Sequence, residues 1–114
     1  MTTQIPTIIH HLRIIHKDLY CIGLKLPKRD KLGLHKTIED LCLKMLSLSI
    51  EAAFQTKINK RNTLGKLRIK NSVLQNLIRT ETELKIIDDK TYQQLSEQAV
   101  EISKENNNWI NSLT

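Results

Sequence analysis

The sequence has little of what β-sheet proteins and membrane proteins need. Its 114 residues include three glycines and four aromatic residues, a scarcity that argues against a β-sandwich or a barrel. Its apolar runs are short, so no segment is expected to span a bilayer. The N-terminal stretch MTTQIPTIIHH also lacks the basic start and apolar run of a signal peptide. We therefore expect a cytoplasmic protein that has no membrane partner.

The sequence also lacks the short motifs that form nucleophilic active sites or bind phosphates or metals. There is no GxSxG, no GxxxxGKS and no glycine-rich dinucleotide turn. No histidine belongs to an HExxH motif, and no Glu-x-x-His pair is present. We interpret the four histidines as structural or surface residues: His10, His11, His16 and His35. The sequence thus predicts a non-enzymatic protein with no catalytic residue, no metal site and no cofactor.

Two further groups could carry chemistry but have plainer interpretations. Cys21 and Cys42 do not form a CxxC pair, and within helical patterns we expect both to be buried, reduced thiols. Glu97, Glu101 and Glu105 step by four along a predicted helix. Like charges at that spacing usually mark a solvated surface, which is how we interpret this ladder.

Apolar residues recur with a helical period in four segments. The first runs from Ile5 to Leu26, beginning near Pro6 and ending before Pro27. The second runs from Leu34 to Ala52, with Asp30 as a candidate N-cap. Both patterns step by three and four residues, which keeps the apolar side chains on one stripe of a helix.

The last two helical segments differ in regularity. The third, from Leu64 to Leu84, is interrupted by Asn71 and Glu81, so we expect it to be partly exposed or to face a polar partner. The fourth, from Tyr92 to Leu113, is regular and follows Asp88 and Asp89, which are candidate caps. A polar connector over residues 55–66, with Asn62 or Thr63 as a cap, is predicted before the third.

Four helices of roughly 30 Å with short connectors predict an all-α fold. The simplest arrangement is an up-down-up-down antiparallel four-helix bundle in which residues 1–114 form a single domain. The second helix carries an additional apolar row that an isolated bundle does not need. We interpret this row as the interface of a homo-oligomer: Leu43, Leu46, Ile50 and Ala53.

The net charge of +6 is concentrated in the first half of the chain. Residues 1–61 hold eleven Lys and Arg against five Asp and Glu, whereas residues 62–114 hold seven of each. Such an asymmetry favours a polyanionic partner, because neutralising phosphates releases counterions.

Two basic clusters could hold that partner. The larger has six cations and no acid within fourteen residues, and includes Lys57, Lys60, Arg61, Lys66, Arg68 and Lys70. Arg68, Ser72, Gln75 and Arg79 then form a polar ridge on the third helix. The smaller cluster, at the corner around Pro27, comprises Lys28, Arg29 and Lys31. No aromatic stacking platform accompanies either cluster, so we expect contacts to the nucleic-acid backbone rather than to bases.

Several stretches in their order resemble one family. They are LKLPKRDKLGLHKTIEDL, LSLSIEAA, KLRIKNSVLQNLIRTETELKIIDDKTYQQLSEQ and NNNWINSL. Together they resemble the accessory variability determinant (Avd) proteins of diversity-generating retroelements, which are small basic four-helix bundles. The sequence departs from that family at Asn106, Asn107 and Asn108, where glycines usually precede the tryptophan.

The resemblance implies a homopentameric, ring-like barrel that binds a reverse transcriptase and its template RNA and supports mutagenic cDNA synthesis. The partners it implies are RNA or RNA/DNA, the reverse transcriptase and further copies of the chain. One alternative is a protein-interaction scaffold whose basic faces bind an acidic protein. Another is a bundle of the type encoded in ribosomal RNA intervening sequences, although the segment SIEAAFQTK differs from the Asn-Ile-Ala-Glu-Gly typical of that type.

Overall fold

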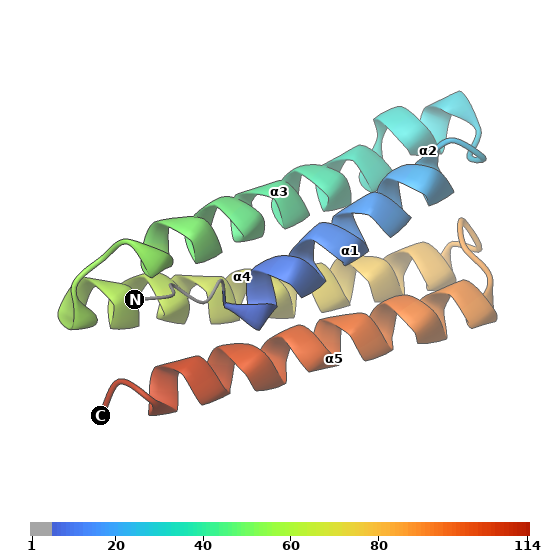
Figure 1. The fold of residues 1–114 in the computed structure, drawn as a ribbon. Helices are drawn as coiled ribbons and strands as arrows, with labels where there is room; N and C mark the ends of the chain where they lie inside the picture. Colours follow the sequence, from blue (N-terminus) through green and yellow to red (C-terminus); the bar gives the residue numbers. More distant parts are fainter. Residues whose placement is uncertain (1–5) are drawn as a thin grey trace.

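The computed structural model describes residues 6–114, which form helices and, within that range, no strand (Figure 1). The long helices are α1 (Thr7–Gly23), α3 (Leu34–Ala53), α4 (Lys57–Glu83) and α5 (Asp89–Asn111), and a short α2 (Lys28–Leu32) lies between α1 and α3. The predicted all-α class is confirmed. Ile5, the first residue of the predicted apolar series, lies outside the described residues.

The four long helices pack side by side as a bundle measuring 46 × 20 × 19 Å. Helix α1 contacts α3 and α5, and α4 contacts the same two helices, so the bundle is closed on itself. Figure 1 shows successive long helices running in opposite directions. Consequently α2 and the α4–α5 connector lie at one end, and the α3–α4 connector lies at the other with the C-terminus.

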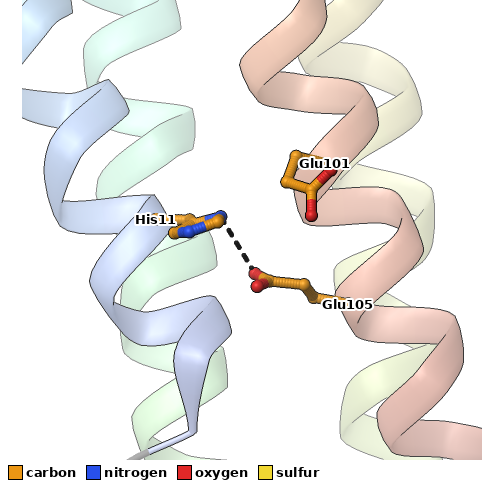
Figure 2. Close-up of side chains that lie close together, drawn as sticks. All are labelled: His11, Glu101 and Glu105. Carbon is orange, nitrogen blue, oxygen red and sulfur yellow. Dashed lines mark ion pairs between the residues drawn. The ribbon is translucent and has the colours of Figure 1, made fainter.

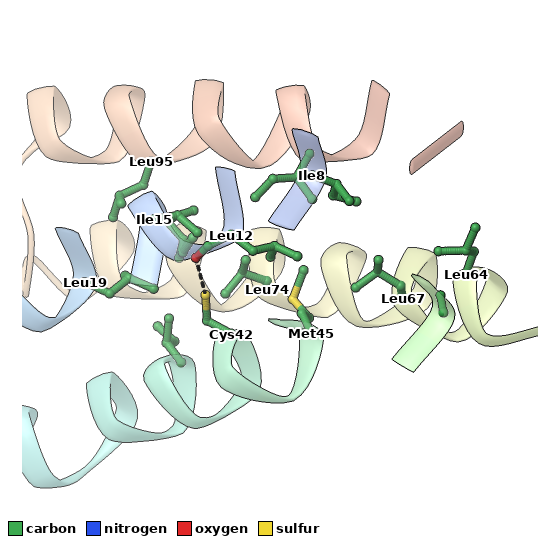
Figure 3. Close-up of a cluster of buried hydrophobic side chains, with 14 of the residues drawn as sticks. Ile8, Leu12, Ile15, Leu19, Cys42, Met45, Leu64, Leu67, Leu74 and Leu95 are labelled. Carbon is green, nitrogen blue, oxygen red and sulfur yellow. Dashed lines mark hydrogen bonds between the residues drawn. The ribbon is translucent and has the colours of Figure 1, made fainter. Parts of the chain in front are cut away.

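The predicted apolar stripes face the core. Ile8, Leu12, Ile15 and Leu19 of α1 are at most 2% exposed, as expected from their spacing (Figure 3). The other helices supply further buried residues to the same cluster: Ile38, Cys42, Met45, Ala52, Leu64, Leu67, Leu74, Ile78, Leu95 and Ile102. Leu84 is an exception, because it lies at the end of α4 and is 63% exposed.

Buried polar side chains fix the register of α4 against α5. The Asn71 amide nitrogen donates to the Ala99 carbonyl at 3.0 Å, and Asn106 donates in the opposite direction to the Leu64 carbonyl, also at 3.0 Å. The two bonds are seven residues apart on each helix, so they mark a single antiparallel register. The predicted interruption at Asn71 is therefore no exposed patch: it faces a polar partner inside the bundle.

Of three predicted helix boundaries, the structure confirms one and corrects two. Asp88 is the N-cap of α5, and its Oδ1 accepts from the Thr91 backbone N–H at 2.8 Å, as predicted. The prediction for Asp30 is wrong: it lies inside α2, and Gly33 precedes α3.

The predicted connector over residues 55–66 is also wrong, because α4 already begins at Lys57. Thr63 is buried within this helix, where its hydroxyl donates to the Gln55 side chain at 2.7 Å. No proline follows Ala53 to end a helix, and a polar first turn can extend into solvent on a long helix. Polarity alone therefore gave the wrong boundary.

Candidate anion-binding surface

The larger basic cluster lies on α4, the longest helix of the bundle. Arg61, Arg68 and Arg79 are exposed, as are Lys57 and Lys66. Lys60 and Lys70 are half-buried. Because α4 begins at Lys57, the whole cluster has the fixed spacing of one helix rather than the freedom of a loop.

These cations have no carboxylate partner among the described residues. Ion pairs in residues 6–114 involve His11, Arg29, His35 and Lys36, none of which lies on α4. Arg68 instead donates to the side-chain oxygen of Asn107 on α5 at 2.8 Å. The Lys60 ammonium lies 5.7 Å from the centre of the Trp109 ring, within range of a cation–π contact. The positive charge of this cluster is therefore not neutralised by any carboxylate of residues 6–114.

The charge also accumulates at the unfavourable end of the helix. Lys57, Lys60 and Arg61 lie in the first turns of α4, where the helix dipole is itself positive. The first turn contains no acid, and Thr56, at the N-cap position, makes no side-chain capping bond. Each such cation costs about 0.3–1 kcal/mol at an exposed helix end, so this arrangement does not serve the stability of α4.

Five of the seven cations of α4 lie in two rows along the helix. With about 100° per residue, Arg61, Arg68 and Arg79 lie within about 20° of one another around the helix, on the side of α5. Lys66 and Lys70 are turned from this row by about 160°, toward the side on which Glu81 contacts His35 of α3.

An apolar strip separates the two rows. Ile69 and Val73 lie between them on the outer face of α4, at 67% and 44% exposure. The predicted surface is therefore an apolar strip with basic residues on both flanks rather than a uniform patch.

The corner cluster lies at the other end of the bundle. Lys28, Arg29 and Lys31 belong to α2, where all three are exposed and Arg29 contacts Asp30 at 3.2 Å. Figure 1 shows α2 at the end opposite the start of α4, so the two clusters do not form one site. Arg79 lies in the part of α4 that approaches the end holding α2.

The predicted oligomer row is partly accessible, and sequence reasoning missed part of it. Leu43 and Ile50 are 49% and 43% exposed, whereas Leu46 and Ala53 are half-buried. Phe54 and Ile58, at 87% and 78% exposure, are further exposed apolar residues on either side of the α3–α4 connector. The spacing of four residues between Ile50 and Phe54 was a usable signal, whereas Ile58 lay within the predicted polar connector.

The two cysteines differ in environment. Cys42 is buried, its thiol lies 3.9 Å from the Leu12 carbonyl (Figure 3), and burial raises its pKa to about 12. This is the predicted structural thiol. Cys21 is exposed, which corrects the expectation of a second buried thiol. It lies in the last turns of α1 on the side away from the core.

The structure also brings together histidines and carboxylates that are distant in the sequence. His35 is buried against Glu81 of α4. His11 of α1 lies beside Glu101 and Glu105 of α5, with its Nδ1 3.2 Å from Glu105 Oε2 (Figure 2). Partial burial raises the pKa of the Glu105 carboxyl and Glu101 adds to the rise, although His11 opposes it. Spacing within single helices could not reveal either group.

No protein-family model matches the chain, and no curated protein or solved structure is detectably similar to it. Within residues 6–114, none of the helices is both long and apolar enough to cross a membrane.

Proposed function

We propose that this chain is a non-enzymatic protein that binds RNA or RNA/DNA through backbone phosphates. The observation that carries the proposal is the unneutralised charge of α4, which accumulates at the positive end of the helix dipole without a cap or an acid. A surface that works against helix stability in this way is suited to a polyanion. Base-specific contacts are not part of the proposal, because the aromatic ring that lies against a cation of the cluster, Trp109, is half-buried.

The biological setting rests on the resemblance to the Avd family. On that basis we propose an accessory subunit of a diversity-generating retroelement, which binds the reverse transcriptase and template RNA in support of mutagenic cDNA synthesis. The row that includes Leu43 and Ile50 would join copies of the chain into a ring, a pentamer by resemblance. A ring repeats each basic row, and several weak phosphate contacts then act together on one long nucleic acid.

The test is a titration of the protein with a structured RNA over a range of salt concentrations. If phosphate contacts dominate, the logarithm of the affinity falls linearly with the logarithm of salt concentration, by about 0.7–0.9 per phosphate contacted. Arg68→Glu should weaken binding and reduce that slope. Lys90→Glu, which reverses an exposed charge in the first turn of α5, is the matched control and should bind as the unaltered chain does. A salt-independent affinity would overturn the proposal.

The exposed strip at Ile69 and Val73 favours a second candidate, a protein-interaction scaffold. A strip of apolar residues flanked by cations suits an acidic amphipathic segment of another protein. The apolar residues of the strip would gain nothing from contact with phosphates. Nuclease treatment separates the two candidates. A scaffold keeps its partner after RNA is removed, whereas an RNA-mediated complex dissociates.

A bundle of the ribosomal RNA intervening-sequence type would also bind RNA and is distinguished by gene position. The gene of a retroelement accessory protein lies beside a reverse transcriptase gene and a repeat pair. The gene of an intervening-sequence bundle lies inside a ribosomal RNA gene.

A further inference from the structure

Three side chains with metal-binding donors converge between the first and last helices. His11 projects from α1, and Glu101 and Glu105 project from α5, one helical turn apart, so that both carboxylates lie on the face toward His11 (Figure 2). One donor atom from each lies within 4.8 Å of the other two. An imidazole nitrogen with two carboxylate oxygens is a common donor set for zinc and related divalent transition metals.

The closest pair already has the spacing of metal ligands. His11 Nδ1 and Glu105 Oε2 are 3.2 Å apart. In a tetrahedral site with zinc bonds near 2.0–2.1 Å, neighbouring ligand atoms lie about 3.3 Å apart. Glu101 is exposed, so a change of its rotamer can bring its carboxylate to the same distance.

A second observation is independent of this spacing. Glu105 Oε2 is shielded from solvent and accepts no hydrogen bond among the described residues, and His11 Nδ1 contacts it at 3.2 Å as an ion pair. A buried carboxylate oxygen without a donor is rare in proteins, where such atoms are normally hydrogen-bonded or bound to a cation. This oxygen points toward the imidazole that would share the ion (Figure 2).

The surroundings leave room for the rest of a coordination sphere. His11 and Glu101 line a groove of about 320 Å³ between α1 and α5, together with Ile14 and Gln98. Solvent can therefore supply the ligands that the three side chains do not. Three protein ligands with water in the fourth position is a coordination that zinc adopts in proteins.

We propose that His11, Glu101 and Glu105 bind one divalent transition-metal ion, for which Zn²⁺ is the natural probe, and that the ion ties α1 to α5. The two helices come from opposite ends of the described chain and are joined by a hydrogen bond from Gln98 of α5 to Asp18 of α1, at 2.8 Å. A metal bridge would add a second polar link across the same seam. The inference does not depend on the proposed function.

The test uses the full chain carrying Cys21→Ser, because the exposed thiol is a competing zinc ligand. Zn²⁺ binding is measured by calorimetry and by the rise in melting temperature, and Co²⁺ serves as a spectroscopic substitute. We expect one ion per chain and an upward thermal shift. His11→Gln and Glu101→Gln should each weaken binding at least about tenfold and reduce the thermal shift.

The matched control is Glu97→Gln, which removes the next carboxylate of the same ladder and the same groove but none of the three ligands. It should bind the ion as the background chain does. Glu101 is exposed, so circular dichroism of Glu101→Gln should show an intact fold. Three results would overturn the inference: no saturable binding by the background chain, unchanged affinity in His11→Gln and Glu101→Gln, or an equal loss in Glu97→Gln.

Discussion

The imidazole of His35 and the carboxylate of Glu81 lie 2.8 Å apart, and solvent reaches neither side chain. The other ring nitrogen of His35 is 2.6 Å from the Leu19 carbonyl and 3.4 Å from Glu39 Oε1. The ring therefore joins α1, α3 and α4 near the end of the bundle that holds α2. A carbonyl oxygen only accepts, so the nitrogen facing Leu19 carries a proton.

The charge of His35 follows from these contacts. Burial alone lowers the pKa of His35, but hydrogen bonds to Glu81 and to the Leu19 carbonyl, with the negative charges of Glu81 and Glu39, outweigh it and raise the pKa above its usual value. A histidine whose pKa is raised on folding stabilises the fold below its unfolded pKa of about 6.5. That contribution is lost as the pH rises through the raised pKa of the folded state.

The first prediction is a stability that declines on the alkaline side. Between about pH 6.5 and the raised pKa of His35, the free energy of unfolding should fall with pH. In the double variant His35→Leu/Glu81→Leu this decline should disappear, because both charges are gone. Urea denaturation from pH 5 to 9 measures both profiles, and equal slopes would contradict the assignment of a charged His35.

The free energy of unfolding of the single variant His35→Leu provides a second test of this pair. His35→Leu leaves the Glu81 carboxylate buried without its partner, which should cost about 3–5 kcal/mol near neutral pH. The double variant should be much closer to the unaltered chain, because replacing a whole buried ion pair by apolar residues is often neutral.

Local patterns predicted most of the fold. The stripes of α1 and α5 were correct, because a spacing of three and four residues defines a helix face without reference to other helices. For Glu81 and Asn71, in contrast, the pattern within one helix did not show whether the side chain is exposed or paired. Whether a polar residue on an apolar stripe is exposed or paired depends on what another helix presents to it, such as His35 or the Ala99 carbonyl.

The candidate sites show the same limit more strongly. The cations of α4 were identified from their density, but their division into two rows depends on where the helix begins. A connector predicted over residues 55–66 hid both the rows and the exposed Ile58. His11 was judged against spacings within one helix, whereas its neighbours Glu101 and Glu105 lie about ninety residues away in the sequence.

The second prediction contrasts two helical glycines. A Cβ on Gly23 would lie 2.8 Å from Glu39 Oε1 and 3.0 Å from Cδ2 of His35. The ring of His35 is held by its hydrogen bonds and cannot retreat, so Gly23→Ala should destabilise the protein by about 1–3 kcal/mol. Gly65 has nothing within 4 Å of such a Cβ, so Gly65→Ala should stabilise α4 by about 0.5–1 kcal/mol. Thermal denaturation of the two variants should give shifts of opposite sign.

The third prediction separates the two rows of cations on α4. Arg61→Glu/Arg79→Glu reverses two charges of the row on the α5 side, and Lys66→Glu/Lys70→Glu reverses two on the α3 side. If RNA lies along the arginine row, the first variant should lower affinity by about tenfold or more and reduce the salt dependence by about two contacts. The second variant should have a smaller effect, because its residues face the other side of the apolar strip. Fluorescence anisotropy with one labelled RNA measures both variants, and equal losses would indicate diffuse binding without a preferred row.

The fourth prediction concerns the apolar row on α3. Ile50 is 43% exposed and Phe54 is 87% exposed in the monomer. The hydrophobic effect favours burying these side chains against another copy of the chain. Ile50→Glu places a charge in that surface, and a buried unpaired carboxylate opposes association strongly. Sedimentation should therefore show an oligomer for the unaltered chain and a shift toward the 13.2 kDa monomer for this variant.

The control is Lys44→Glu, which changes an exposed residue of the same helix that lies off the row. This variant should remain oligomeric with an unchanged helical spectrum. A monomeric unaltered chain, or an Ile50→Glu variant of the same mass as the control, would mean that the row is not an interface between copies.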